Sequence, residues 1–168
     1  VAKAIGPKLA KDTVGGLIND EREVSDLRRA LKSGSRLKIV TVNMPEALEV
    51  IRHSAAHVLA QAVQEIWPDV KVTIGPVIDN GFYYDFASPR PFTPEDLEKI
   101  EKKMEEVIGR DYEVVREDWK ADEAVATFAK LGESFKAEII RDLGAPIVGI
   151  YRQGQWFDLC KGPHVQRL

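Results

Sequence analysis

Residues 51–59 read IRHSAAHVL, and this segment contains two of the three histidines in the chain. The third histidine and the only cysteine lie in a second segment, at residues 158–165, which reads DLCKGPHV. The scarce side chains therefore form two pairs with the same spacing, His53 with His57 and Cys160 with His164. Random placement would seldom produce this coincidence, so the two segments are predicted to meet in one functional site.

The first pair lies in a predicted amphipathic helix that begins near Pro45 and ends before Pro68. On the opposite side from the pair, apolar residues recur at three- and four-residue steps, which is typical of one buried stripe. At about 100° per residue the two histidines share a face, with Cβ atoms roughly 5–6 Å apart. A lone helix histidine is more often a packed side chain, but this pair points away from the expected core. The stripe consists of Leu48, Ile51, Ala55, Val58, Leu59, Ala62 and Ile66.

The second pair flanks Gly162-Pro163, a dipeptide that predicts a turn or loop. Convergence of the two pairs would allow several chemistries. Three imidazoles and a thiolate can form a tetrahedral zinc site, with His53, His57, Cys160 and His164 as ligands. Imidazoles can instead activate a water and protonate a leaving group. A cysteine beside a histidine can also serve as a nucleophile.

Composition restricts the classes of function. The chain has 168 residues, 44% of them hydrophobic, and a net charge of -3. Such a length suits one good-sized domain, or one domain with a small appendage. No run is long enough to cross a membrane and no signal peptide opens the chain, so we expect no membrane partner. A single cysteine cannot form an internal disulfide, which suits the cytoplasm.

The acidic balance also bears on nucleic acid. A domain that grips a phosphate backbone by itself is normally basic, so any RNA contact here is expected to be local. The chain begins at Val1 rather than at a methionine. We expect it to be a fragment of a larger protein.

The pattern of elements predicts an α+β fold. Residues 1–42 are expected to form a small α+β unit with too few apolar residues for its own core. Residues 43–168 are expected to form a domain of helices packed on a mostly antiparallel sheet. Thr93 should cap a helix, with Asp96 in the capping-box position. The strands and helices expected outside the histidine helix are a helix at 1–11, strands at 13–18 and 36–42, a strand pair at 70–77 and 81–86, a helix after 93 with Leu97, Ile100, Met104, Val107 and Ile108 inward, a strand at 112–119, a helix at 121–129, and a hairpin at 147–151 and 155–159.

Four motifs resemble those of a single family. They read IRHSAAH at 51–57, IGPVIDNGFYYD at 74–85, GESFK at 132–136 and CKGPHV at 160–165. On these motifs, nearly the whole chain resembles the N-terminal part of bacterial threonyl-tRNA synthetases. The resemblance implies that residues 1–42 are part of a small ubiquitin-like (TGS-type) domain. It implies that residues 43–168 are a tRNA editing domain, which in the family continues past position 168 and is related to that of alanyl-tRNA synthetases.

The resemblance implies a function, the hydrolysis of serine wrongly esterified to threonine-specific tRNA. Serine lacks one methyl group of threonine, and such a difference supplies only roughly 1–3 kcal/mol of discrimination. A second site that excludes threonine by its methyl group would correct the error. The implied partners are a tRNA 3′ end carrying serine and the rest of the synthetase, with its ATP-binding catalytic domain, its anticodon-binding domain and a homodimeric assembly. No cofactor is required on this interpretation.

Position by position, the resemblance implies catalytic roles for His53, His57, Lys136, Asp158, Cys160 and His164. His53, helped by Lys136, is expected to activate water at the ester carbonyl, and Lys136 to have a depressed pKa. Asp158 is expected to orient the substrate amine or a histidine. The further candidates for the substrate pocket are Tyr84, Asp79 and Lys161, although an aromatic such as Tyr84 more often packs in a core.

Three alternatives stay open from the sequence. The first is a metal-dependent hydrolase of another aminoacyl ester, which would lose activity with a chelator. The second is a non-catalytic tRNA-binding module, which turnover of charged tRNA would exclude. The third is a structural zinc domain, which a chelator should unfold.

Overall fold

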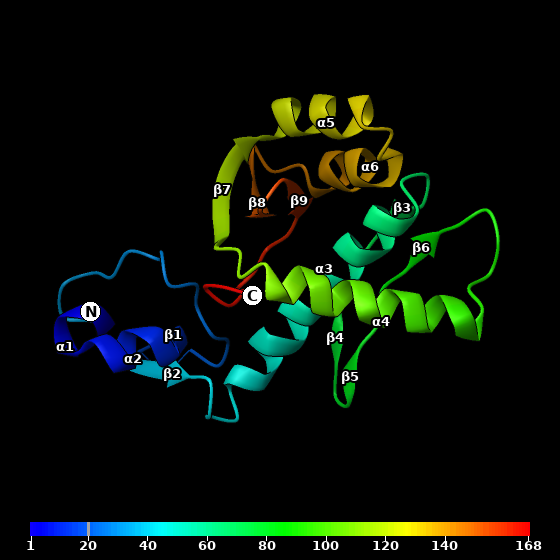
Figure 1. The fold of residues 1–168 in the computed structure, drawn as a ribbon. Coiled ribbons are helices and arrows are strands. Elements are labelled where there is room, and N and C mark those ends of the chain that lie inside the picture. The colour runs from blue at the N-terminus through cyan, green and yellow to red at the C-terminus, as the bar shows by residue number, and fades with distance from the viewer. Residues whose placement is uncertain (20) are drawn as a thin grey trace.

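The computed structural model describes residues 1–19 and 21–168, and the 20-residue helix α3 (Ala47–Ile66) runs through its middle (Figure 1). The N-terminal elements lie at the start of α3, and the C-terminal sheet lies above it in the view of Figure 1. All strand pairs of the described residues are antiparallel. The predicted α+β class is therefore confirmed.

Two short helices, α1 (Ala2–Ile5) and α2 (Pro7–Asp12), replace the single helix predicted at 1–11. The break falls at Gly6-Pro7 because proline has no N–H to donate and its ring clashes with the preceding turn. The predicted strands are confirmed as β1 (Thr13–Ile18) and β2 (Leu37–Thr41), which pair with each other. Between these strands the sequence Asn19-Asp20-Glu21 predicts a turn, and Asp20 of this turn lies outside the described residues.

The N-terminal part shares its core with α3. Val14, Val24 and Val40 pack against Ala47 and Val50 at the start of the helix. The sequence predicted too few apolar residues for a separate core, and the packing agrees. The domain boundary at residue 42 stays a prediction.

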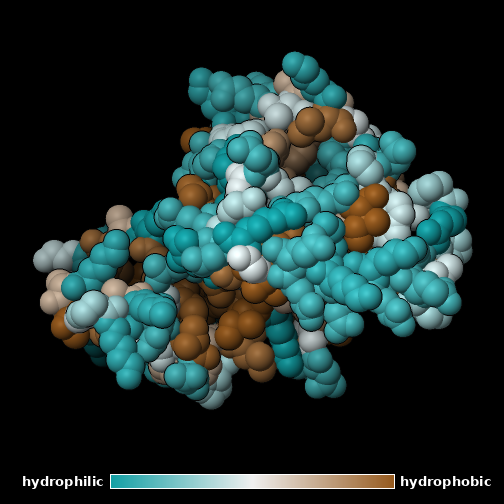
Figure 2. Space-filling model, viewed as in Figure 1, coloured by the Kyte–Doolittle hydropathy of each residue, from teal (hydrophilic) through white to brown (hydrophobic). Residues whose placement is uncertain are grey.

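Helix α3 is buried on more sides than its sequence predicted. Leu48 and Ile51 of the expected stripe are 47% and 37% exposed, whereas His57 and Ala60 of the opposite face are 4% and 0% exposed. The prediction of a single buried stripe was wrong because α3 crosses the middle of the molecule, with α4 (Pro94–Gly109), β1 and three further strands against it. Figure 2 shows an apolar area below α4, on the side where α3 begins. It lies between the N-terminal elements and the hairpin of β4 (Val77–Ile78) and β5 (Gly81–Phe82).

The predicted strand pair at 70–77 and 81–86 is present as two short pairs. The outer pair joins β3 (Lys71–Val72) to β6 (Phe86–Ala87), and the hairpin joins β4 (Val77–Ile78) to β5 (Gly81–Phe82). Pro76 interrupts the ladder between them because it lacks a backbone N–H. Tyr84, which lies between β5 and β6, is 9% exposed and packs with Ala56, Ala60 and Val72.

Helix α4 (Pro94–Gly109) begins as predicted, with Thr93 as N-cap and both hydrogen bonds of the capping box to Asp96. Its buried stripe is narrower than predicted, because Leu97 and Ile108 are 60% and 49% exposed. Ile100 packs with Val63 of α3. Polar side chains cover the outward face of α4 (Figure 2).

The C-terminal part is a three-stranded sheet in the order β7-β8-β9, covered by two helices (Figure 1). The predicted strands and the helix at 121–129 are confirmed, but α6 was not predicted. Its sequence has no side chain that caps its first turn. None of the described helices is both long and apolar enough to cross a membrane. The elements are β7 (Val114–Lys120), α5 (Ala121–Lys130), α6 (Ser134–Leu143), β8 (Ile147–Gln153) and β9 (Trp156–Leu159).

Candidate functional site

The structure brings the two predicted pairs together in an imidazole–thiol cluster of His53, His57, Cys160 and His164. Cys160 Sγ lies 3.2 Å from His53 Nε2 and 3.2 Å from His164 Nε2. The His164 ring centroid is 4.2 Å from that of His53 and 4.1 Å from that of His57. The convergence expected from the shared spacing is therefore present.

The loop after β9 carries Cys160 and His164 to α3, and its path requires a glycine. Gly162 has a φ of +74°, and a Cβ there would lie 1.9 Å from Tyr151 Oη. Only glycine combines this backbone conformation with so close an approach. The Gly162 N–H in turn donates to Cys160 Sγ at 3.2 Å.

Ser54, which the sequence analysis did not single out, fixes the orientation of His164. Its hydroxyl donates to Val50 O at 2.9 Å and accepts from the Val165 N–H at 3.0 Å. Its contact with His164 Nδ1, at 3.2 Å, therefore has the ring N–H as the donor. His164 Nε2 is then an acceptor facing the Cys160 thiol. In the sequence, the position of Ser54 between His53 and His57 is the feature that could have predicted this role.

Burial keeps this cluster neutral. Burial lowers the pKa of His53 below its ordinary value and lowers the pKa values of His57 and His164 much further. The neighbouring imidazoles add to the effect at His57 and His164 by charge repulsion. Burial also raises the pKa of the Cys160 thiol to about 12. A thiol that holds its proton at neutral pH is a poor nucleophile, so the cysteine-nucleophile option loses support.

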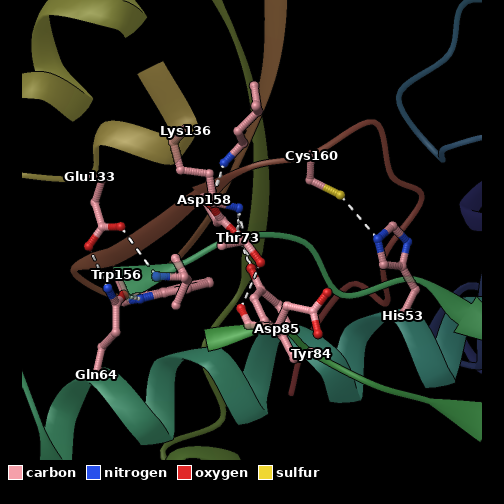
Figure 3. A network of polar contacts seen from close by, with 12 residues as sticks. His53, Gln64, Thr73, Tyr84, Asp85, Glu133, Lys136, Trp156, Asp158 and Cys160 are labelled. Atoms are coloured by element: carbon pink, nitrogen blue, oxygen red, sulfur yellow. Dashed lines mark hydrogen bonds and ion pairs between the residues drawn. The ribbon is translucent and has the colours of Figure 1, made fainter. Parts of the chain in front are cut away.

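A second group, the ion-pair cluster of Tyr84, Lys136 and Asp158, lies beside the first (Figure 3). Lys136 Nζ lies 2.7 Å and 2.8 Å from the two carboxylate oxygens of Asp158. Tyr84 Oη donates to Asp158 Oδ2 at 2.7 Å and lies 3.3 Å from Lys136 Nζ. Lys136 and Asp158 are each 2% exposed in their side chains. The pair is therefore a buried salt bridge with its hydrogen-bonding capacity met.

The structure shows the protein contacts of Asp158 and Lys136. The carboxylate of Asp158 accepts from Lys136 and from Tyr84, and the role expected for it toward the substrate amine or a histidine stays a prediction. The hydrogen bonds of Lys136 go to the other two members of its cluster. Its charge acts on His57 at longer range and helps to lower the pKa of that ring.

The three further pocket candidates lie in different places. Tyr84 is buried and packs against Phe86 while its hydroxyl binds Asp158. Asp79 lies at the exposed tip of the β4–β5 hairpin, where Arg52 donates to its backbone oxygen at 2.8 Å. The structure therefore does not bring Asp79 into the site. Lys161 is 89% exposed at the rim, with Nζ 3.6 Å from Glu23.

A cleft of about 1280 Å³ opens over His53 and Cys160. Its other walls come from positions 21–29 of the N-terminal part, from Pro76 and Val77, and from the start of β8. Small-molecule sites range from about 300 to 1,000 Å³, so this cleft has room for more than an amino acid. His53 and Cys160 face the opening, while His57 and His164 are buried behind them.

The imidazole–thiol cluster also fits a zinc ion by its donor set. One ligand atom from each of its four residues lies within 4.8 Å of all the others. Zinc takes three imidazoles and a thiolate at bond lengths of about 2.0–2.3 Å. The hydrogen bond of Ser54 to His164 Nδ1 would leave Nε2 as the ligand atom. The expectation that zinc can be bound here remains compatible with the site.

Comparison with known proteins gave no matching family model. Curated relatives named threonine–tRNA ligase match nearly the whole chain. Those of Bdellovibrio bacteriovorus, Rhodospirillum rubrum and Hyphomonas neptunium are 56%, 52% and 52% identical over 99%, 98% and 98% of it. The chain spans about a quarter of the length of these relatives, between 25% and 26%.

Proposed function

The chain belongs to the threonine–tRNA ligase family, and on that premise we propose that it hydrolyses serine from mischarged threonine-specific tRNA. The observation that carries the proposal is the meeting of His53 and Cys160 at the floor of an open cleft, with a buried lysine–aspartate pair beside them. A protein that only bound tRNA would have no need for such a set of buried titratable groups.

In the proposed reaction, the 3′ end of the tRNA enters the cleft with its seryl group toward His53. A water molecule attacks the ester carbonyl carbon, and its proton passes to the neutral imidazole of His53. The bond between the carbonyl carbon and the ribose oxygen breaks, and the ribose oxygen takes that proton. Free serine and uncharged tRNA are the products.

The buried residues around His53 support this step. The lowered pKa of His53 keeps its ring unprotonated at neutral pH, which is the form that a base requires. His57, Cys160 and His164 hold the ring in place through short contacts. The ammonium of Lys136, paired with Asp158, acts on the imidazole–thiol cluster through its charge, which helps to lower the pKa of His57.

The remaining parts of the proposal concern the whole protein. We assign residues 1–42 to a partial ubiquitin-like domain and residues 43–168 to the editing domain. The catalytic and anticodon-binding domains of a dimeric, cytoplasmic synthetase would deliver the mischarged tRNA. The acidic net charge of -3 fits a domain that depends on other parts of the protein to hold the RNA.

The test is deacylation of seryl- and threonyl-tRNA by this chain and by its His53→Ala variant. We expect seryl-tRNA to be hydrolysed at least about ten-fold faster than threonyl-tRNA. We expect His53→Ala to lower kcat on seryl-tRNA about 100-fold or more. Leu48→Ala, an exposed truncation on the same helix, is the matched control and should keep the full rate. Equal rates for His53→Ala and Leu48→Ala would refute the proposal.

The four converging ligand atoms favour a second candidate, a zinc-dependent form of the same hydrolysis. His53, His57, Cys160 and His164 would hold the ion, which would supply an activated water or polarise the carbonyl. Metal analysis of the purified chain, with deacylation before and after chelation, distinguishes the two forms. Activity that survives complete metal removal supports the metal-free reaction. Loss of both metal and fold on chelation would instead indicate a structural zinc site.

A further inference from the structure

A buried carboxylate outside the two clusters belongs to Glu133, the residue just before α6. It is 7% exposed, and no step of the proposed reaction uses it. Its Oε1 accepts from Gln64 Nε2 at 2.7 Å, and its Oε2 accepts from the backbone N–H of Val72 at 3.3 Å. Lys71 Nζ lies 3.8 Å from Oε1. Burial raises the pKa of Glu133, while Lys71 and the two N–H donors favour the anion.

The contacts of Glu133 continue to the strand that carries Asp158. Gln64 Oε1 accepts from the Trp156 indole N–H at 2.8 Å, and Figure 3 shows Trp156, Gln64 and Glu133 in one chain of hydrogen bonds. Trp156 precedes Asp158 by two residues in β9, and its ring meets that of His57 edge-on, with centroids 5.5 Å apart. The chain of hydrogen bonds therefore ties α3, β3, β9 and the start of α6 together.

Lys136 lies in the first turn of α6, three residues after Glu133. The position of its Nζ against Asp158 depends on where that helix begins, because Ser134–Leu143 has no side-chain cap of its own. We propose that Glu133 is a positioning residue, which fixes Lys136 against Asp158 and Tyr84 by anchoring the start of α6 to Gln64 and the Val72 N–H. This inference rests on the proposed function for its effect on catalysis, but its structural part can be measured without it.

The directions of the hydrogen bonds make the carboxylate necessary. Two N–H groups converge on the two oxygens of Glu133, and a carboxylate accepts at both. In Glu133→Gln one of these donors would face an amide NH₂. Gln64 cannot relieve the conflict by turning its amide, because its oxygen already accepts from Trp156.

Exchanging the two side chains should repair the conflict. In the Gln64→Glu/Glu133→Gln double variant, residue 64 accepts from Trp156 and from the amide of residue 133. The oxygen of residue 133 then accepts from the Val72 N–H. The double variant loses the contact of Gln64 with Val70 O, at 3.3 Å, and the ion pair of Lys71 with residue 133, at 3.8 Å. Gln64→Glu adds the negative charge that Glu133→Gln removes, so the double variant has the net charge of the wild type, with the carboxylate at residue 64 instead of residue 133.

The experiment compares wild type, Glu133→Gln, the double variant and Glu138→Gln, an exposed control on the same helix. The first readout is modification of Lys136 by an amine-reactive reagent, located by mass spectrometry. Lys136 should be protected in wild type and control, become labelled at least about ten-fold faster in Glu133→Gln, and be protected again in the double variant. The second readout is seryl-tRNA deacylation, where Glu133→Gln should lower kcat about 10- to 100-fold with KM unchanged.

The outcomes separate the two proposals. Unchanged protection of Lys136 in folded Glu133→Gln overturns the positioning role, whatever the activity. Faster labelling of Lys136 in Glu133→Gln that persists in the double variant also overturns the positioning role. No deacylation by wild type refutes the proposed function, while the labelling still decides the role of Glu133. If Glu133→Gln shows no thermal unfolding transition, Gln64→Ala replaces it. Lys136 should again be labelled at least about ten-fold faster, and unchanged protection of Lys136 would overturn the positioning role.

Discussion

The two clusters of the site differ in charge, because one consists of neutral groups and the other contains an ion pair. The imidazole–thiol cluster is made of groups that burial drives to their neutral forms. The ion-pair cluster encloses a full positive and a full negative charge at 2% exposure. The imidazoles of the first cluster are unprotonated at neutral pH, which is the form that a general base requires. In the second, the two charged groups lie 2.7 Å apart and are closed off from solvent.

The difference also separates stability from chemistry. Loss of one member of a neutral cluster leaves a cavity or an unmet hydrogen bond, whereas loss of one member of a buried ion pair leaves an uncompensated charge. We therefore expect the ion-pair cluster to dominate stability and the imidazole–thiol cluster to dominate the reaction. The following variants test that division.

The largest stability effect is expected for Lys136→Met, which leaves Asp158 buried without its counter-charge. We expect a loss of about 3–5 kcal/mol in the free energy of unfolding, measured by urea denaturation. The Lys136→Met/Asp158→Leu double variant should regain most of it, because both charges are then absent. His53→Ala, in the neutral cluster, should cost less than about 2 kcal/mol. A loss in His53→Ala as large as in Lys136→Met would contradict the division.

The next effect is a loss of stability in acid from His57 and His164. Their folded pKa values lie well below the ordinary 6.5, so above pH 6.5 neither state takes up protons at these rings. Below pH 6.5 the unfolded chain binds protons that the folded chain does not, and stability falls with falling pH until the folded values are reached. The slope should approach about 1.4 kcal/mol per pH unit for each histidine.

This slope can be measured by urea denaturation of metal-free protein at several pH values between 7.5 and 5. In His164→Gln the contribution of His164 is absent, so the slope should fall by up to about 1.4 kcal/mol per pH unit. An unchanged slope in that variant would assign the acid sensitivity to other groups.

A smaller effect is expected at Gly75, which lies against the ring of Tyr84 in the ion-pair cluster. A Cβ at this position would lie 2.2 Å from Tyr84 Cδ2. Gly75→Ala should therefore displace the ring and cost about 1–3 kcal/mol in unfolding free energy. In a Tyr84→Leu background the same substitution should cost clearly less, because the clashing ring is absent. Equal costs in the two backgrounds would rule out the clash as the cause.

The smallest effect is expected for Ser54→Ala, on the neutral side. The hydroxyl of Ser54 accepts the Nδ1 proton of His164, so its loss should reduce the preference for that tautomer by about 1 kcal/mol. The tautomer ratio can be read from the ¹⁵N chemical shifts of the His164 ring. A ratio that does not change would mean that Cys160, and not Ser54, selects the tautomer.

The sequence predicted the two clusters unequally. The repeated spacing of the scarce histidines and the cysteine was enough to predict that His53, His57, Cys160 and His164 meet. Nothing in spacing linked Tyr84, Lys136 and Asp158, which lie on three separate segments, and only the resemblance to threonyl-tRNA synthetases brought Lys136 and Asp158 forward. The family itself is confirmed by the relatives, whereas the roles of these residues stay proposals.

Local signals in the sequence determined the elements whose causes are local. The capping box at Thr93, the strands predicted at 13–18 and 147–151 and the hairpin turn after the second follow from hydrogen bonds and dihedral angles within a few residues. Only the tertiary structure decided that Leu48 and Ile51 are exposed, that Lys136 binds Asp158, and that Glu133 is buried against Gln64. Burial and charge pairing depend on which distant segments meet, and a helix that crosses the middle of a fold has neighbours that its own periodicity cannot reveal.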